Sequence, residues 1–219
     1  MQSPELMVVR NEVDSNCEYH CDALTAQFPG AREIDYPAGD RPDLDRVDGV
    51  VLTGSTAGVY EVDERPWIGE QQQLVRDLID REIPTLGVCF GHQLVNVALG
   101  GTVEHVGTTC RPVDATLADD PLFTDVSSTV PVAHGDVVTD AGDDLEVIAS
   151  ADYYEVFGTR HRDAPLWTVQ FHPEFTAALC DRLVADFGWT DDGAGFDAID
   201  ATHVFENFRA IVAATVAQS

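Results

Sequence analysis

The segment at residues 84–101, PTLGVCFGHQLVNVALGG, constrains the possible fold more than any other part of the chain. A short apolar run of strand type enters Gly-x-Cys-x-Gly, and a segment with helical spacing leaves it and ends at two glycines. This pattern is the cysteine form of a nucleophile elbow, in which a strand turns sharply into a helix. The turn has no room for Cβ atoms on either side, which accounts for Gly87 and Gly91. It would place Cys89 at the carboxyl edge of a parallel sheet, where open α/β folds bind ligands.

Cys89 would also lie at the N-terminus of the predicted helix at 90–99. The unpaired N–H groups and the positive end of the helix dipole favour a thiolate over a thiol there, which is the form that a nucleophile needs. A buried cysteine on a glycine-rich turn is the structural alternative, and the pentapeptide alone does not separate the two interpretations.

Segments of strand and helix type alternate through the first half of the chain. This alternation predicts an α/β three-layer sandwich with a mainly parallel central sheet. Between residues 103 and 170 short β-type runs follow one another, which predicts an antiparallel extension of the same sheet. The expected strands are 5–10, 31–39, 48–54 and 83–89, then VEHVG, TVPVAHGD, LEVIAS, YYEVFGTRH and LWTVQF; the expected helices are 15–28, 67–81, 90–99, 176–187 and 201–216, with an acidic loop at 190–200. We assign residues 1–219 to a single domain with a C-terminal helical extension at about 188–219.

The charge balance limits the possible partners. The chain has 39 acidic and 12 basic residues, a net charge of −27, and every basic residue is arginine. Such a negative surface repels nucleic acid and anionic membranes, so we expect neither as a partner. A hydrophobic content of 44% argues against a disordered acidic chain, and the dispersed acidity fits a folded, halophilic protein whose self-repulsion is screened by salt. We find no transmembrane run and no signal peptide, so the expected location is the cytoplasm.

Five cysteines in a cytoplasmic chain are expected to be reduced. Cys17, His20 and Cys21 in CEYHC have helical spacing, but no second cluster supplies further zinc ligands, and we interpret them as one face of a helix. We expect no metal and no other cofactor.

His172 ends the apolar run LWTVQF and is followed by Pro173 and Glu174. Residues two apart on an extended segment project to one side, so Glu174 could accept a hydrogen bond from one ring nitrogen while the other faces Cys89. A thiolate used in acyl transfer needs such an imidazole with an orienting carboxylate. The alternative for HPE is a turn at the end of a strand with a surface carboxylate.

GVCFGHQL followed by ALGG, with VQFHPEF further on, resembles the class I (triad-type) glutamine amidotransferases over about residues 50–175. The resemblance is closest to the amidotransferase part of GMP synthase and its free-standing relatives. It implies a Cys89–His172–Glu174 triad that hydrolyses the side-chain amide of glutamine to glutamate and ammonia through a γ-glutamyl thioester on Cys89. His172 would take the thiol proton, return it to the leaving ammonia and then activate water.

The resemblance also implies an oxyanion hole formed by the backbone N–H groups of Gly54 and Phe90. Many relatives carry Gly-Gly-Pro where this chain has Gly54, Ser55 and Thr56, and this departure affects which amide donates.

Further substrate contacts are implied for Gln93 and Ser55. AHGD resembles the segment whose backbone receives the amino-acid end of glutamine, namely Ala133, His134 and Gly135. The structural alternatives are a helix-surface amide for Gln93 and an ordinary turn for AHGD. His92 matches the family as a structural side chain at the start of the helix.

Three functions are compatible with these residues. The first is an amidotransferase subunit that passes ammonia to a synthetase; because the sequence has no G-x-x-x-x-G-K-[ST] loop, the ATP-dependent step would lie on a separate polypeptide. The second is a stand-alone γ-glutamyl hydrolase or peptidase that uses the same thioester. The third is a non-enzymatic sensor or binding protein, which a missing triad residue would favour, and none is missing.

Overall fold

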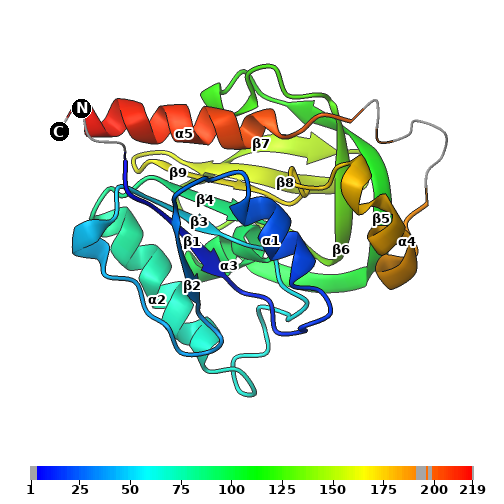
Figure 1. Cartoon of the computed structure of the whole chain (residues 1–219), viewed down its shortest axis with the longest axis horizontal. Coiled ribbons are helices and arrows are strands. Elements are labelled where there is room, and N and C mark those ends of the chain that lie inside the picture. Colours follow the sequence, from blue (N-terminus) through cyan, green and yellow to red (C-terminus); the bar gives the residue numbers. More distant parts are fainter. Residues whose placement is uncertain (1–3, 191–195, 197–198, 219) are drawn as a thin grey trace.

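The computed structural model describes residues 4–190, 196 and 199–218 of the 219-residue chain. Nine strands within these residues form one sheet in the order β2-β1-β3-β4-β9-β8-β7-β5-β6 (Figure 1). The strands are β1 Leu6–Arg10, β2 Arg32–Asp35, β3 Gly49–Leu52, β4 Thr85–Val88, β5 Thr102–Leu117, β6 Thr129–Asp140, β7 Leu145–Ala151, β8 Tyr154–His161 and β9 Leu166–Val169.

The sheet has a parallel half and an antiparallel half. β2, β1, β3, β4 and β9 pair in parallel, and β8, β7, β5 and β6 continue the sheet antiparallel, which confirms the expected organisation. LWTVQF, expected within the antiparallel extension, belongs to it on one side only: β9 pairs antiparallel with β8 but in parallel with β4, and so forms the junction of the two halves. All four residues of β9 are buried, as suits a strand covered on both faces, but a short apolar run does not reveal its neighbours.

Helices cover both faces of the sheet and complete the expected three layers (Figure 1). Apolar residues of α2 and α3 join one core with Val50 and Leu52, whereas those of α1 and α5 join the other core with Val51. Neighbouring residues of β3 therefore enter different cores, because side chains alternate across a strand. The helices are α1 Tyr19–Thr25, α2 Trp67–Asp80, α3 Phe90–Ala98, α4 Cys180–Phe187 and α5 His203–Val216.

The helix expected at 15–28 is shorter in the structure and begins at Tyr19. The Asp14 carboxylate accepts a hydrogen bond from the backbone N–H of Asn16 at 2.9 Å, and the Asp14 carbonyl accepts one from Cys17 at 2.9 Å. Such local bonds from an Asp side chain compete with helix formation. The helix expected at 176–187 likewise starts with a 3-10 turn at Ala177–Leu179 before α4, and most of the expected acidic loop lies outside the described residues.

The C-terminal helix α5 is built into the core. Val204, Phe205, Phe208 and Val212 are fully buried, and the Phe205 ring lies edge-on to that of Phe28 with centroids 5.4 Å apart. None of the described helices is both long enough and apolar enough to cross a membrane.

Candidate active site

Cys89 lies between β4 and α3 with backbone angles φ 52° and ψ −102°. A positive φ is uncommon for a residue other than glycine and is typical of the strained turn that presents a nucleophile. A Cβ atom at Gly87 would lie 2.7 Å from the carbonyl oxygen of Gly91, and one at Gly91 would lie 2.6 Å from that of Leu52. Because both obstacles are backbone atoms, the chain can turn here only with glycine on both sides of Cys89.

His172 follows β9, which pairs with β4, so Cys89 and His172 leave adjacent parallel strands at the same edge. Nδ1 of His172 lies 2.7 Å from Oε1 of Glu174, and the Phe175 ring stacks on the imidazole with centroids 4.2 Å apart. Glu174 is 1% exposed, and its second carboxylate oxygen has no hydrogen-bond partner among the described residues. The charge of Glu174 is therefore directed at His172, whose ring orientation it fixes together with Phe175.

The backbone of Ala133 on β6 lies beside both side chains. Its carbonyl oxygen is 3.9 Å from Sγ of Cys89 and 3.3 Å from Nε2 of His172. Burial lowers the pKa of His172, but the charges of Cys89 and Glu174 outweigh burial and raise this pKa well above 6.5. The raised pKa favours the protonated, imidazolium form of His172.

A pocket of about 320 Å³ opens onto Cys89 and His172. This volume is at the lower end of the range for small-molecule sites and suits a compound the size of an amino acid. The residues expected to contact substrate all line it, namely Ser55, Gln93, Ala133, His134 and Gly135. The structure thus gathers residues from segments far apart in the sequence into one site, with Glu174 buried behind His172.

Gly54 lies directly beside Cys89. A Cβ atom at this position would be 3.1 Å from Cε1 of His172, 3.4 Å from Cε1 of His20 and 3.5 Å from Cβ of Cys89. Phe90 is the first residue of α3, so its N–H belongs to the helix turn whose amides have no partner within the helix. The two amides expected to form the oxyanion hole therefore belong to residues that flank Cys89.

Gln93 and His134 are buried and bonded to the protein. Nε2 of Gln93 donates to the backbone oxygen of Asp136 at 3.3 Å and to Oε1 of Gln170 at 3.2 Å, so Gln93 is not a helix-surface amide. His134 bonds the backbone oxygen of Asp136 through Nδ1 at 3.0 Å and the hydroxyl of Tyr153 through Nε2 at 2.9 Å. Burial lowers the pKa of His134 to about 4, so this ring is neutral at physiological pH.

His92 is fully buried beneath the site and is hydrogen-bonded through both ring nitrogens. Nδ1 lies 2.7 Å from Oγ1 of Thr168, and Nε2 lies 2.9 Å from the carbonyl oxygen of Val156. Burial lowers its pKa to about 3, and the neutral ring joins α3 to β8 and β9.

The sequence analysis missed Glu12 as a site residue, and it interpreted His20 as part of a helix face after considering it as a zinc ligand. Both line the pocket, and Oε2 of Glu12 lies 2.7 Å from Nε2 of His20. One available signal was the position of Glu12 just beyond a buried strand, where the carboxyl edge of a parallel sheet gathers functional groups. Within the part of the chain that the structure describes, no three His, Cys, Asp or Glu side chains are arranged to hold a metal ion.

An elbow cysteine, an imidazole and a buried carboxylate at the carboxyl edge of an α/β sheet define a cysteine-dependent enzyme. The family model for glutamine amidotransferase class-I matches residues 8–188. The chain therefore belongs to the class-I glutamine amidotransferases.

Comparisons with individual proteins agree with this family. The chain is 37% identical over 128 residues to "GMP synthase [glutamine-hydrolyzing]" of Mycobacterium marinum, an alignment that covers 57% of this chain and 23% of that protein. It is 35% identical over 139 residues to the enzyme of the same name from Thermobifida fusca, covering 62% of this chain and 25% of that protein. The chain thus spans about a quarter of the length of these curated relatives.

Solved structures share the whole fold. A putative GMP synthase subunit from Thermoplasma acidophilum superposes with a TM-score of 0.72 at 20% identity, covering 100% of this chain and 98% of that one. A glutamine amidotransferase from Thermotoga maritima gives a TM-score of 0.72 at 21% identity, covering 98% and 96% of the two chains. At such identities the likeness concerns the fold.

Proposed function

We propose that this chain is the glutaminase component of a glutamine amidotransferase, hydrolysing glutamine to glutamate and ammonia through a thioester on Cys89. The proposal rests on one observation: Cys89 and the His172–Glu174 pair lie together at the wall of an amino-acid-sized pocket.

The reaction would proceed in two halves. His172 takes the thiol proton, and the Cys89 sulfur attacks the side-chain amide carbon of glutamine to form a tetrahedral oxyanion. Collapse of this intermediate breaks the C–N bond, and His172 returns the proton to the leaving group, which departs as ammonia. A water molecule, deprotonated by His172, then attacks the thioester and releases glutamate and the free thiol. Glu174 orients the imidazole and stabilises its charged form in both halves.

The N–H groups of Gly54 and Phe90 would donate to the oxyanion, because both residues flank the reacting sulfur. Ser55 and the strand segment at 133–135 would hold the amino-acid end of glutamine within the pocket, and Gln93 would support that segment through its bond to Asp136.

Ammonia would pass to an ATP-dependent synthetase. The relatives named as GMP synthase are about four times as long as the matched region, so a GMP-forming synthetase is the partner that we propose. The five cysteines are all free thiols, which fits the reducing cytoplasm where we place the reaction. We expect no role for nucleic acid or a membrane surface.

The first test is glutaminase turnover by the purified chain in high salt, with and without the candidate synthetase and its nucleotide substrate. We expect Cys89→Ser to lower kcat by at least about 10³-fold, as loss of a nucleophile does, and Cys180→Ser to serve as a matched control. Cys180 opens α4 and is the least buried of the five cysteines. Mass spectrometry after reaction with the diazoketone analogue of glutamine should find the label on Cys89.

The outcomes separate the candidate functions. Turnover that requires the synthetase supports the role of a synthetase subunit, whereas efficient cleavage of γ-glutamyl peptides by the chain alone would support the hydrolase instead. If neither substrate is turned over and Cys89 is not labelled, with or without the synthetase, a sensor or binding role would replace the enzyme.

A further inference from the structure

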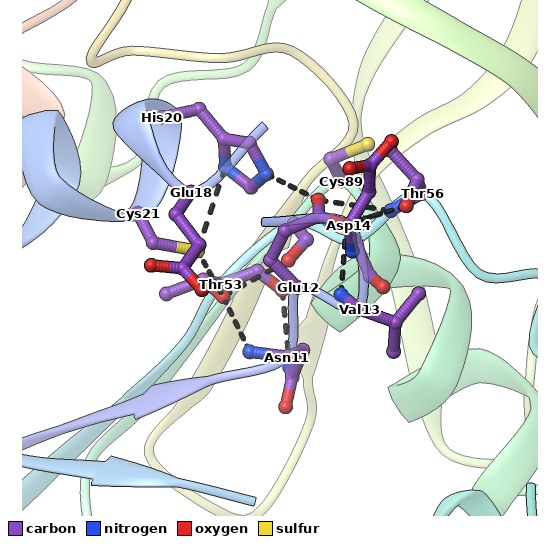
Figure 2. Close-up of polar contacts among 12 residues, drawn as sticks. Asn11, Glu12, Val13, Asp14, Glu18, His20, Cys21, Thr53, Thr56 and Cys89 are labelled. Carbon is purple, nitrogen blue, oxygen red and sulfur yellow. Dashed lines mark hydrogen bonds and ion pairs between the residues drawn. The ribbon is translucent and has the colours of Figure 1, made fainter. Parts of the chain in front are cut away.

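Asn11 and Glu12, which follow β1, hold the loop at residues 53–56 (Figure 2). This loop has the sequence Thr-Gly-Ser-Thr and contains Gly54. Asn11 donates from its backbone N–H to Oγ1 of Thr53 at 3.0 Å and from its side chain to the carbonyl of Thr53 at 3.1 Å. Gln71 of α2 in turn donates to Oδ1 of Asn11 at 2.7 Å. The N-terminal end of the 53–56 loop is therefore tied to β1 and, through Asn11, to α2.

The carboxylate of Glu12 holds the other end of the loop. It accepts from the backbone N–H of Thr56 at 3.0 Å and also from the Thr56 hydroxyl. The N–H groups of Val13 and Asp14 donate to the same carboxylate at 2.8 Å each. Because the backbone N–H of Thr56 is already bonded to Glu12, Thr56 is not an oxyanion donor. The oxyanion donor of this loop must therefore be the amide of a residue before Thr56.

His20 completes the arrangement on the side of the nucleophile. Its Nε2 lies 2.7 Å from Glu12, its Nδ1 lies 3.7 Å from Sγ of Cys21, and Figure 2 shows both contacts. The His20 ring packs edge-on to that of His172 with centroids 6.1 Å apart, and its Cε1 would be 3.4 Å from a Cβ at Gly54. The His20 ring therefore lies next to Gly54, the residue that we assign to the oxyanion hole.

We propose that Glu12 and His20 are positioning residues that clamp the 53–56 loop so that the Gly54 amide faces the oxyanion formed on Cys89. The inference rests on the proposed thioester chemistry. Both ring nitrogens of His20 already have partners, and the Glu12 carboxylate is filled by donors of the protein, so neither residue binds substrate directly. The clamp takes the place of the Gly-Gly-Pro sequence, whose proline would stiffen the loop by itself.

The charges of the pair make the clamp stable over a wide pH range. Burial raises the pKa of Glu12, but the bonds from His20, Thr56 and Asp14 outweigh it and lower this pKa to about 2. Burial lowers the pKa of His20, but its contacts with Cys21 and Glu12 outweigh burial and raise this pKa to about 10. The carboxylate and the imidazolium therefore coexist between about pH 4 and pH 8.

The direct test is Glu12→Gln, measured as kcat and KM for glutamine. An amide would turn N–H groups toward donors of the loop, and we expect kcat to fall about 10- to 100-fold, because loss of an oxyanion donor costs about 10²–10³ and the clamp acts through that donor. KM should change less than about threefold, since the oxyanion exists only in the transition state. Glu18→Gln removes the same charge from a half-exposed side chain in the same segment and should leave kcat unchanged.

A pH profile separates positioning from general support of the fold. In His20→Phe the carboxylate of Glu12 loses its cationic partner, its pKa rises, and it takes up a proton in mildly acidic solution. The ratio of wild-type to variant kcat should therefore grow as the pH falls from 8 to about 5. The more conservative His20→Gln keeps an N–H donor for Glu12 and should recover much of the activity. The other ionisable groups around the pair are the same in both proteins, namely Asp14, Cys17, Cys21, Glu61, Arg65 and His172.

Unchanged kcat in Glu12→Gln, a change confined to KM, or a ratio independent of pH would each overturn the clamp. If Glu12→Gln does not fold, Thr56→Val removes only the hydroxyl contact, and we expect about a tenfold loss of kcat from the loosened loop. Labelling of Cys89 by the diazoketone analogue keeps the two proposals apart. If the wild-type protein is labelled and active and the clamp variants are fully active too, the clamp alone is refuted. If the wild-type protein is neither labelled nor active, the proposed function is refuted.

Discussion

Replacing Gly91 with alanine tests the geometry of the elbow at one atom. Gly91 is the second residue of α3, and a Cβ there would lie 2.6 Å from the carbonyl oxygen of Leu52 on β3 and 2.9 Å from its Cβ. An ordinary contact begins at about 3.4 Å, so α3 and β3 must separate by about 0.8 Å. This displacement would carry the N-terminus of α3, and with it Phe90 and the apex at Cys89, away from its position.

The expected cost in stability is moderate. Overpacking of this kind costs about 1–3 kcal/mol, and the better helix propensity of alanine returns up to about 1 kcal/mol. We expect a net loss of about 1–2 kcal/mol, which for a chain of this size lowers Tm by about 2–8 °C. The effect on turnover should be larger than the effect on stability, because a shift of about 1 Å can cost about 10²-fold in rate; we expect kcat to fall about 10- to 100-fold.

Thermal unfolding followed by circular dichroism and glutaminase assays would measure the two effects. Gly69→Ala is the matched control, because Gly69 lies within α2 and a Cβ there would meet only one side-chain atom, Cγ1 of Val62, at 3.3 Å, so a shift of about 0.1 Å restores an ordinary contact. That variant should be as stable as the wild type or up to about 1 kcal/mol more stable. A Gly91→Ala protein with wild-type Tm and turnover would refute the close approach of α3 to β3.

Three further predictions concern the whole molecule. Phe208→Ala should destabilise the protein by about 3–5 kcal/mol and lower Tm by about 6–20 °C, because Phe208 is fully buried, whereas Val216→Ala at the exposed end of α5 should not; equal Tm values would refute the packing of α5. The free energy of unfolding, measured by denaturant titrations, should fall as the pH drops from 6.5 to 5. In the folded protein the pKa values of His92 and His134 are lowered to about 3 and 4, so in this pH range only the unfolded chain binds protons at these two histidines. Each histidine should lower the free energy of unfolding by up to about 1.4 kcal/mol per pH unit. A flat profile would contradict this, and His134→Gln should remove about half of the slope. With a net charge of −27, Tm should rise between about 0.1 M and 1 M KCl, as the Debye length shrinks from about 10 Å to 3 Å, and a Tm independent of salt would contradict a role for self-repulsion.

The strands and helices of the parallel half of the fold could be predicted from local sequence patterns. Each expected strand and helix around Cys89 exists, because β-rich apolar runs, helical spacing and paired glycines are properties of a few consecutive residues. β9 was the exception. Its four residues identify a buried strand, but its pairing with β4 depends on how the antiparallel extension returns to the sheet, which no local period encodes.

The beginning of α1 shows the same limit at shorter range. Helical spacing over 15–28 did not reveal that the Asp14 side chain caps a turn and delays the helix to Tyr19. That turn matters for the site, because it sets the position of His20 on α1 next to the carboxylate of Glu12.

The sequence by itself determined the class of fold, the cysteine at the sharp turn and the histidine and glutamate that follow the last strand, since each is written in adjacent residues. Only the tertiary structure decided that Glu12 and His20 lie against Gly54, because residues from β1, α1 and the segment after β3 meet at the carboxyl edge of the sheet only after the strands have paired. Their contacts in the folded protein then decided their charge states: the bonds to Glu12 and the contacts of His20 outweigh the cost of burial, because opposite charges attract more strongly where water is excluded.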